Sequence, residues 1–143
     1  MDIFLRFQSP LGTILAVCTN NGISRIENGT AAGFAEAEST SNETLDLCKK
    51  QILDYLAGAR REFELPIDWS SITGFQSDVL HLTNEIPYGE VLTYGGIART
   101  LGKPAASRAV GGALARNPIP VLIPCHRVVA ASGALTGYSA ANG

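Results

Sequence analysis

Three side chains that can do chemistry are adjacent near the end of the sequence: the thiol of Cys125, the imidazole of His126 and the guanidinium of Arg127. They follow the apolar run IPVLIP at residues 119–124, which predicts a strand held by prolines. Cationic neighbours favour the thiolate, the nucleophilic form of cysteine. Most cysteines are buried structural residues, but a core strand gains nothing from His126 and Arg127. The segment therefore predicts that Cys125 is a nucleophile.

The other two cysteines, Cys18 and Cys48, are far from Cys125 in sequence, and the chain has no CxxC pair. An odd number of widely spaced cysteines favours free thiols over a disulfide framework. The cysteines and the two histidines also lack the spacing of a zinc site. We expect no metal ion and no cofactor.

Charge is distributed unevenly along the 143 residues, whose net charge is −2. Residues 1–71 carry 6 Lys and Arg against 10 Asp and Glu, whereas residues 72–143 carry 5 against 3. This balance argues against a uniformly basic nucleic-acid-binding protein. Any contact with DNA is expected in the second half.

The first half has the pattern of a small antiparallel sheet followed by a helix. Residues 3–7, 13–18 and 23–26 favour strands joined by short turns. Apolar residues then recur at helical spacing from Leu45 to Leu56, with Asn42 as a possible N-cap and Gly58 as the stop. A polar stretch at residues 68–71 places the boundary near residue 70, so we expect one domain over 1–70 and another over 71–143.

The second half predicts short helices over residues 75–82, 94–101 and 105–115, separated by turns that contain proline and glycine. Two such helices joined by a glycine-containing turn have the outline of a helix-turn-helix. The predicted fold class is α/β in the broad α+β sense: an N-terminal antiparallel sheet with a helix, then a helical, winged-helix-like DNA-binding domain.

No apolar run approaches the roughly 20 residues needed to span a bilayer. Met1-Asp2 followed by an alternating segment does not have the pattern of a signal peptide. We expect no membrane partner, a monomer, and a cytoplasmic location, or a nuclear one in a eukaryote.

Three ordered motifs give a specific resemblance: IPYGEVLTYGGIA at 86–98, SRAVGGALARNPIP at 107–120 and PCHR at 124–127. Over about residues 63–139 the chain resembles the O6-alkylguanine-DNA alkyltransferases. The resemblance implies direct-reversal DNA repair in a single turnover. An alkyl (methyl) group passes irreversibly from O6-alkylguanine to a cysteine of the protein after the base flips out of the duplex. It implies double-stranded DNA carrying the lesion as the partner, and leaves alkyl size and action on O4-alkylthymine open.

The same resemblance assigns roles to residues of the candidate catalytic site. Cys125 matches the alkyl-accepting nucleophile, and His126 matches the base that takes the thiol proton through a water. Tyr94 matches the tyrosine that hydrogen-bonds N3 of guanine, and Asn117 the asparagine that joins the recognition helix to the nucleophile segment. The resemblance assigns the walls and edge of the substrate pocket to Pro120, Val128, Tyr138 and Ser139, and its lid to residues 132–139.

Arg108 matches the residue that enters the base stack from the minor groove and fills the space of the flipped nucleotide. Small side chains on the same helix would let it approach the groove closely. The expected DNA-facing residues are Arg108, Ala109, Gly111, Gly112, Tyr94 and Arg127.

Two features depart from the resembled family. Its members usually continue beyond the TyrSer motif with a helix whose glutamate orients the histidine, and the sequence ends at Gly143. From this we expect a less firmly held His126 and slow transfer. Leu80 stands where many relatives have tryptophan, and is expected in the core.

Two other functions fit parts of the sequence. A non-catalytic sensor of alkylated bases, of the alkyltransferase-like type, would explain DNA binding, but such proteins replace the nucleophile. A plain helix-turn-helix regulator would explain the Arg108 helix and leave the PCHR motif without a purpose.

Overall fold

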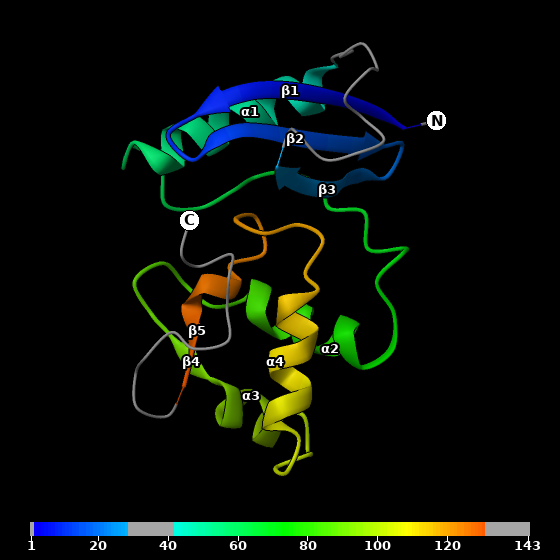
Figure 1. Cartoon of the computed structure of the whole chain (residues 1–143), viewed down its shortest axis with the longest axis vertical. Coiled ribbons are helices and arrows are strands. Elements are labelled where there is room, and N and C mark those ends of the chain that lie inside the picture. Colours follow the sequence, from blue (N-terminus) through cyan, green and yellow to red (C-terminus); the bar gives the residue numbers. More distant parts are fainter. Residues whose placement is uncertain (1, 29–41, 131–143) are drawn as a thin grey trace. The chain divides into compact units, whose positions relative to one another are not determined.

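The computed structural model describes residues 2–28 and 42–130, and its two halves form separate units, Met1–Ser71 and Ile72–Gly143 (Figure 1). The first unit contains strands β1 (Ile3–Ser9), β2 (Gly12–Thr19) and β3 (Gly22–Asn28) and helix α1 (Glu43–Leu56). The second contains helices α2 (Gly74–Asn84), α3 (Tyr94–Thr100) and α4 (Ser107–Ala115), and the short strands β4 (Leu92–Thr93) and β5 (Val128–Val129). The predicted fold class is confirmed, since an antiparallel sheet with a helix precedes a helical unit.

The strands of the first unit form an antiparallel sheet in the order β1-β2-β3. Ser9 pairs with Gly12 and Thr19 pairs with Gly22, so both hairpin loops are tight. β2 is the central strand, and every residue from 14 to 18 is buried. The three strands expected from the sequence are confirmed, and each extends slightly beyond the predicted bounds.

Helix α1 packs on this sheet through Leu45, Cys48 and Ile52, which are fully buried (Figure 1). Its start is fixed by Asn42, whose side chain accepts a hydrogen bond from the N–H of Leu45 at 2.8 Å. Gly58 follows the helix at φ 79°, in the left-handed conformation that commonly ends helices. The predicted cap and stop are both confirmed.

The segment after α1 adds to the outer edge of β3. The N–H of Ile23 donates to the carbonyl of Pro66, and the N–H of Asp68 donates to the carbonyl of Ile23, both at 2.8 Å. A Cβ atom at Gly22 would lie 2.5 Å from the Pro66 carbonyl oxygen. Position 22 therefore has no room for any side chain.

In the second unit, α4 packs against both α2 and α3 (Figure 1). The connection between α3 and α4 covers residues 101–106 and is longer than expected, because α4 begins at Ser107 rather than Ala105. Gly102 in this connection has φ 75°, so the predicted glycine-containing turn is present. All three helices contribute fully buried side chains to the core: Val79, Leu80, Ile97, Ala98, Val110 and Ala113.

Within residues 2–28 and 42–130, none of the helices combines the length and the apolar character needed to cross a bilayer.

The main departure from the predicted secondary structure lies just before Cys125. Residues 119–124 form a turn with one isolated bridge between Pro120 and Ile123, and Val121 in it has φ 75°. The predicted strand is wrong because prolines remove ladder donors and fix φ. The apolar residues Ile119, Leu122 and Ile123 are nevertheless buried, and they enter the core from a turn.

Candidate active site

Cys125 opens a 3-10 helix, η1 (Cys125–Arg127), and the turn before it is held by the side chain of Asn117. The Oδ1 atom of Asn117 accepts a hydrogen bond from the N–H of Ile119 at 2.9 Å. Its Nδ2 atom donates to the carbonyl of Ile123 and to the Sγ atom of Cys125, both at 3.1 Å. One amide thus spans the turn and contacts the thiol directly.

Burial dominates the acid-base properties of Cys125. The residue is 1% exposed, and loss of solvation raises the pKa of its thiol to about 11. Hydrogen bonds from Asn117 and from backbone N–H groups favour the thiolate, but they do not outweigh burial. Burial thus has a larger effect on this thiol than any group that favours the thiolate. Near neutral pH the thiol is protonated, so a nucleophilic reaction needs a base.

His126 follows Cys125 directly in η1 and is partly buried. Burial, and then the positive charge of Arg127, lower the pKa of its imidazole, because both disfavour the imidazolium form. His126 is therefore neutral near pH 7. A neutral imidazole on the residue after the thiol is in the form that can accept a proton.

Tyr94 is placed at the start of α3 by its neighbour Thr93. The Oγ1 atom of Thr93 accepts a hydrogen bond from the N–H of Gly96 at 2.9 Å, which caps the helix. A Cβ atom at Gly96 would lie only 2.9 Å from this Oγ1 atom, so glycine permits the cap. Burial, and then Cys125, raise the pKa of the Tyr94 phenol. Tyr94 therefore keeps its proton and lies within electrostatic range of Cys125.

Strands β4 and β5 connect these two groups. They pair in parallel, with Leu92 opposite Val128 and Thr93 opposite Val129. β4 ends directly before Tyr94, and β5 begins directly after η1. The pair therefore links the start of α3 to the cysteine segment. Strands of two residues leave no detectable period in a sequence, and the pair was not predicted.

Arg127 does not face solvent, as a DNA-binding residue would. It is 7% exposed, and its Nη1 atom donates a hydrogen bond of 2.6 Å to the carbonyl of Ile86. Its guanidinium also lies 5.6 Å from the centre of the Tyr88 ring. This burial and these partners do not favour the assignment of Arg127 to the DNA-facing set. Sequence reasoning missed Ile86 and Tyr88 as its partners because no local pattern indicates this long-range contact.

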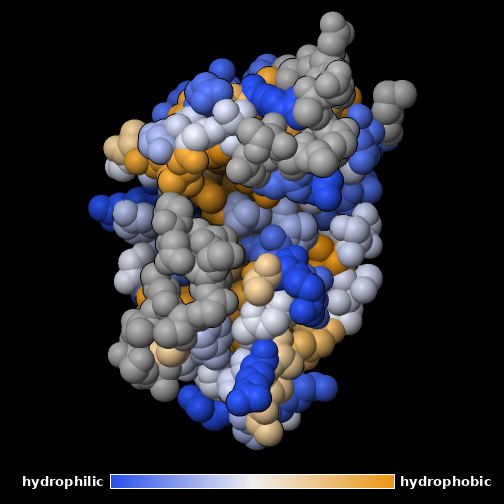
Figure 2. All heavy atoms as spheres, viewed as in Figure 1, coloured by the Kyte–Doolittle hydropathy of each residue, from blue (hydrophilic) through white to orange (hydrophobic). Residues whose placement is uncertain are grey.

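Helix α4 carries four of the predicted DNA-facing residues. Arg108 and Ala109 are exposed in its first turn, and Gly111 and Gly112 are partly exposed further along. Apart from its own helix backbone and chain neighbours, a Cβ atom at Gly111 would meet no atom within 4 Å, so no packing contact requires glycine there. Figure 2 shows the surface over α4 as nearly neutral and interrupted by strongly hydrophilic patches.

The predicted pocket residues are only partly described. Pro120 is partly buried in the turn before Cys125, and Val128 is fully buried in β5. Tyr138, Ser139 and the expected lid at residues 132–139 lie outside the described residues.

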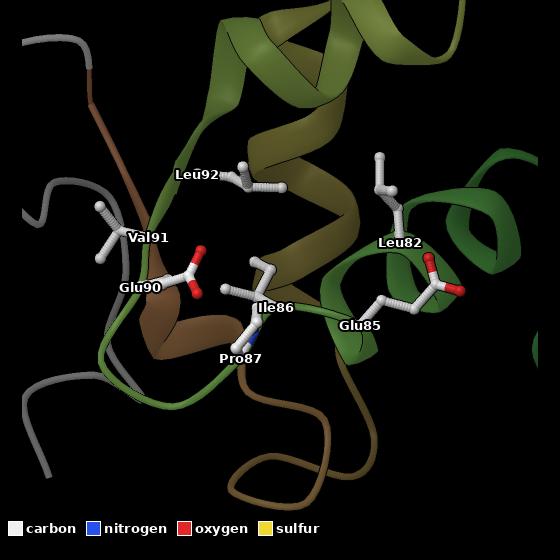
Figure 3. Close-up of a pocket in the computed structure, with 7 residues that line it drawn as sticks. All are labelled: Leu82, Glu85, Ile86, Pro87, Glu90, Val91 and Leu92. Atoms are coloured by element: carbon white, nitrogen blue, oxygen red, sulfur yellow. The ribbon is translucent and has the colours of Figure 1, made fainter.

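A surface pocket of about 200 Å³ lies between the end of α2 and β4 (Figure 3). Its lining is mostly apolar and consists of Leu82, Glu85, Ile86, Pro87, Glu90, Val91 and Leu92. Cys125, His126 and Tyr94 do not line it, so it is distinct from the candidate active site. In the part of the chain that the structure describes, no three His, Cys, Asp or Glu side chains are arranged to hold a metal ion.

Proteins similar over most of the chain carry closely related names. The methylated-DNA--protein-cysteine methyltransferase of Methanosarcina acetivorans is 39% identical over 136 residues, which cover 93% of this chain and 86% of the relative. The constitutive protein of that name from Bacillus subtilis is 37% identical over 145 residues, covering 97% and 87%.

Solved structures agree with these relatives. Mycobacterium tuberculosis O6-methylguanine methyltransferase matches with a TM-score of 0.83 and 34% identity, over 96% of this chain and 84% of that one. Mycobacterium tuberculosis OGT in complex with DNA matches with a TM-score of 0.81 and 34% identity, over 94% and 83%.

Family models match both halves of the chain. Residues 5–69 match the ribonuclease-like domain of 6-O-methylguanine DNA methyltransferase. Residues 74–143 match the DNA-binding domain of the same family. With the thiol, the imidazole and the phenol gathered in the second of these regions, the chain belongs to the 6-O-methylguanine DNA methyltransferase family.

Proposed function

We propose that this protein repairs DNA by moving the methyl group of O6-methylguanine onto its own Cys125, once per molecule. The observation that carries the proposal is the arrangement around the thiol: the Asn117 amide donates to Sγ at 3.1 Å, and the adjacent His126 is neutral. A held thiol with a neighbouring base is the arrangement required of an activated cysteine nucleophile. The names of relatives that cover nearly the whole chain support the same reaction.

The proposed step is a single displacement at the methyl carbon. The S–C bond forms from Cys125 while the bond between the methyl carbon and O6 breaks, and the electron pair of that bond stays on O6. The thiol proton passes to His126, through a water as in the family, and the phenol of Tyr94 donates a proton toward N3 of the leaving base. The imidazolium of His126 then returns its proton to the Tyr94 oxygen, so in the net reaction one proton passes from the thiol to guanine, which leaves uncharged.

Three acid-base properties support these assignments. A thiol whose pKa is about 11 is not appreciably ionised at neutral pH, so proton removal must accompany the attack. The imidazole is neutral and can take that proton, because burial and Arg127 hold its pKa low. The phenol, whose pKa is raised, remains a hydrogen-bond donor.

Access to the base requires that the nucleotide leave the duplex stack, because O6 of a stacked guanine cannot reach a buried thiol. We assign α4 to the minor groove and Arg108, exposed in its first turn, to the space left by the flipped nucleotide. Readout in the minor groove is degenerate, which suits a protein that must examine every sequence. The exposed Arg99, Lys103 and Arg116 of the same unit are available for phosphates.

Intact-protein mass spectrometry tests the reaction. After mixing with duplex DNA that contains one O6-methylguanine, the protein should gain one methyl group, in proportion to the lesion and without turnover. Peptide mapping should place the methyl group on Cys125, and Cys125→Ala and Cys125→Ser should bind the same duplex without gaining mass. A Cys125 variant that still accepts the methyl group would disprove the mechanism.

The same assay distinguishes methyl transfer from the alternative function, that of a non-catalytic lesion sensor. A lesion sensor would bind the methylated duplex without any mass change in the wild-type protein, and iodoacetamide labelling of Cys125 would still be blocked by the bound DNA. An oligonucleotide with O4-methylthymine, run in parallel, measures whether the site accepts that lesion as well.

A further inference from the structure

Among the described residues of the second unit, Arg127 is the one charged residue that is buried. Burying a cation is costly unless its donors are paired, so such a residue is retained where its contacts matter. Two of those contacts are made to one loop, residues 85–91, which connects α2 to β4. The hydrogen bond to the Ile86 carbonyl is short, at 2.6 Å, and the guanidinium covers the ring of Tyr88.

This loop is held on the cysteine segment at both of its ends. Arg127, the last residue of η1, holds its beginning through Ile86. The pairing of β4 with β5 holds its end, and β4 leads directly into Tyr94. These two attachments connect the elements that carry Tyr94 and the nucleophile, and Arg127 supplies the side chain of one of them.

Arg127 also acts on its other neighbour in the sequence. Its positive charge is, after burial, the cause that lowers the pKa of the His126 imidazole. Other titratable groups on adjoining elements are Cys125 and Tyr94, Asp78 and His81 on α2, and Glu85, Tyr88 and Glu90 in the loop. None of these groups is a cause of the lowered pKa of His126.

We propose that Arg127 is a positioning residue of the methyl-transfer site, which ties the 85–91 loop to the cysteine segment and keeps His126 available as a base. The inference rests on the proposed function and adds a residue to it. A guanidinium suits this position because it can donate in the plane of the group to a carbonyl while its face covers an aromatic ring. A lysine would retain the charge but not both contacts.

NMR titration of the histidine side chains tests the electrostatic part. The chain contains two histidines, so the second, His81, serves as an internal reference. In Arg127→Gln the titration of His126 should move to higher pH, because the cation that disfavours imidazolium is lost. In Arg127→Lys it should stay near the wild-type position. A titration of His126 that is unchanged in Arg127→Gln would overturn this part.

Single-turnover kinetics with free O6-benzylguanine, which needs no DNA binding, test the positioning part. The rate at pH 7 should fall at least tenfold in Arg127→Gln and by a smaller factor in Arg127→Lys. Arg60→Gln is the matched control, because the Nη1 atom of Arg60 also donates to a backbone carbonyl, that of Glu62 at 3.0 Å, in the other unit. It should react at the wild-type rate. Equal rates for Arg127→Gln and the wild type would exclude the positioning role.

A third variant covers the case in which Arg127→Gln does not fold. Tyr88→Leu keeps the cation and removes the ring it covers, on a side chain that is 47% exposed. Its rate should fall while the His126 titration stays in place, and a wild-type rate would contradict the loop attachment. A wild-type protein that accepts no methyl group would refute the proposed function but not the role of Arg127. The NMR titration requires no methyl transfer, so it still tests Arg127 in that case.

Discussion

Burial keeps both Cys125 and His126 uncharged in the resting protein. It raises the pKa of the thiol to about 11 and lowers that of the imidazole. The two shifts have the same origin, since each disfavours the ionised form of its group. A site of this kind stores a protected thiol and generates the nucleophile only when a substrate and a base are both in place. Such a thiol resists indiscriminate alkylation and oxidation, which act on thiolates.

The first prediction concerns pH. Methyl transfer should decline only when the pH falls through the lowered pKa of His126, below the ordinary value for histidine, because imidazolium cannot take the thiol proton. Reaction of Cys125 with iodoacetamide, which depends on thiolate, should instead rise with pH toward about 11. Rates measured across pH 4 to 11 by mass spectrometry, in a Cys18→Ala, Cys48→Ala background, check both limbs. Fast iodoacetamide labelling at pH 7 would contradict the buried thiol.

The second prediction concerns Asn117. Asn117→Asp keeps an acceptor for the N–H of Ile119 but loses the donors to the Ile123 carbonyl and to Sγ, and adds a negative charge beside the thiol. We expect a lower free energy of unfolding, by about 1–3 kcal/mol, from the unsatisfied groups. The transfer rate should fall as well, since a nearby negative charge raises the pKa of the thiol further. Urea denaturation and single-turnover kinetics measure the two effects, and unchanged kinetics would remove Asn117 from the site.

At the scale of elements, α4 presents small side chains and an exposed arginine on one surface. The third prediction is that Arg108→Ala slows repair of duplex DNA by about tenfold, or about 1.4 kcal/mol, because the gap left by the flipped base is no longer filled. Reaction with free O6-benzylguanine should change little, since no base has to be flipped. Arg60→Ala, in the first unit, serves as the control. Equal losses on both substrates would assign Arg108 a structural role instead.

Elements whose signals are local could be predicted from the sequence. Asn42 caps α1 because a side-chain amide lies at the spacing that reaches the N–H of Leu45, and this spacing is visible in the sequence. Gly58 ends the same helix for a reason equally visible, its left-handed φ of 79°. The buried stripe of α1 follows the helical period.

Elements set by long-range contacts could not be predicted. The run at 119–124 has the composition of a strand, yet its prolines and the Asn117 amide fold it into a turn. Arg127 was expected among the DNA-facing residues, and only the fold reveals the Ile86 carbonyl that accepts its hydrogen bond. The raised pKa of Cys125 could not be predicted for the same reason, because burial cannot be read from neighbours in sequence.

At the scale of the whole molecule, the first unit has its own stabilising network at its end. The carboxylate of Asp68 accepts hydrogen bonds from Thr19 Oγ1 at 2.6 Å and from the N–H and Oγ of Ser70 at 2.9 and 2.6 Å. The hydrogen bonds with Ser70, followed by that with Thr19, lower the pKa of Asp68. The network attaches the segment that leaves the first unit to β2.

The fourth prediction follows from this network. A carboxyl whose pKa is lower in the folded state contributes stability above its unfolded pKa, about 3.9, and loses it as the pH falls through the folded value. The melting temperature of the wild-type protein should therefore fall more steeply below pH 4 than that of Asp68→Asn. At pH 7 the variant should be the less stable protein. Parallel pH dependences, measured by circular dichroism, would show that Asp68 does not contribute.

The close approach of Gly22 to Pro66 also bears on aggregation. A three-stranded sheet presents two edges whose unpaired backbone groups can recruit strands from other molecules. Here the segment from Pro66 to Asp68 occupies part of the β3 edge, through both the N–H and the carbonyl of Ile23. Any side chain at position 22 would push this segment away, because its Cβ atom would lie 2.5 Å from the Pro66 oxygen. Glycine at position 22 thus allows this edge to stay covered. Its replacement would expose unpaired backbone groups of β3 to strands of other molecules, in addition to destabilising the first unit.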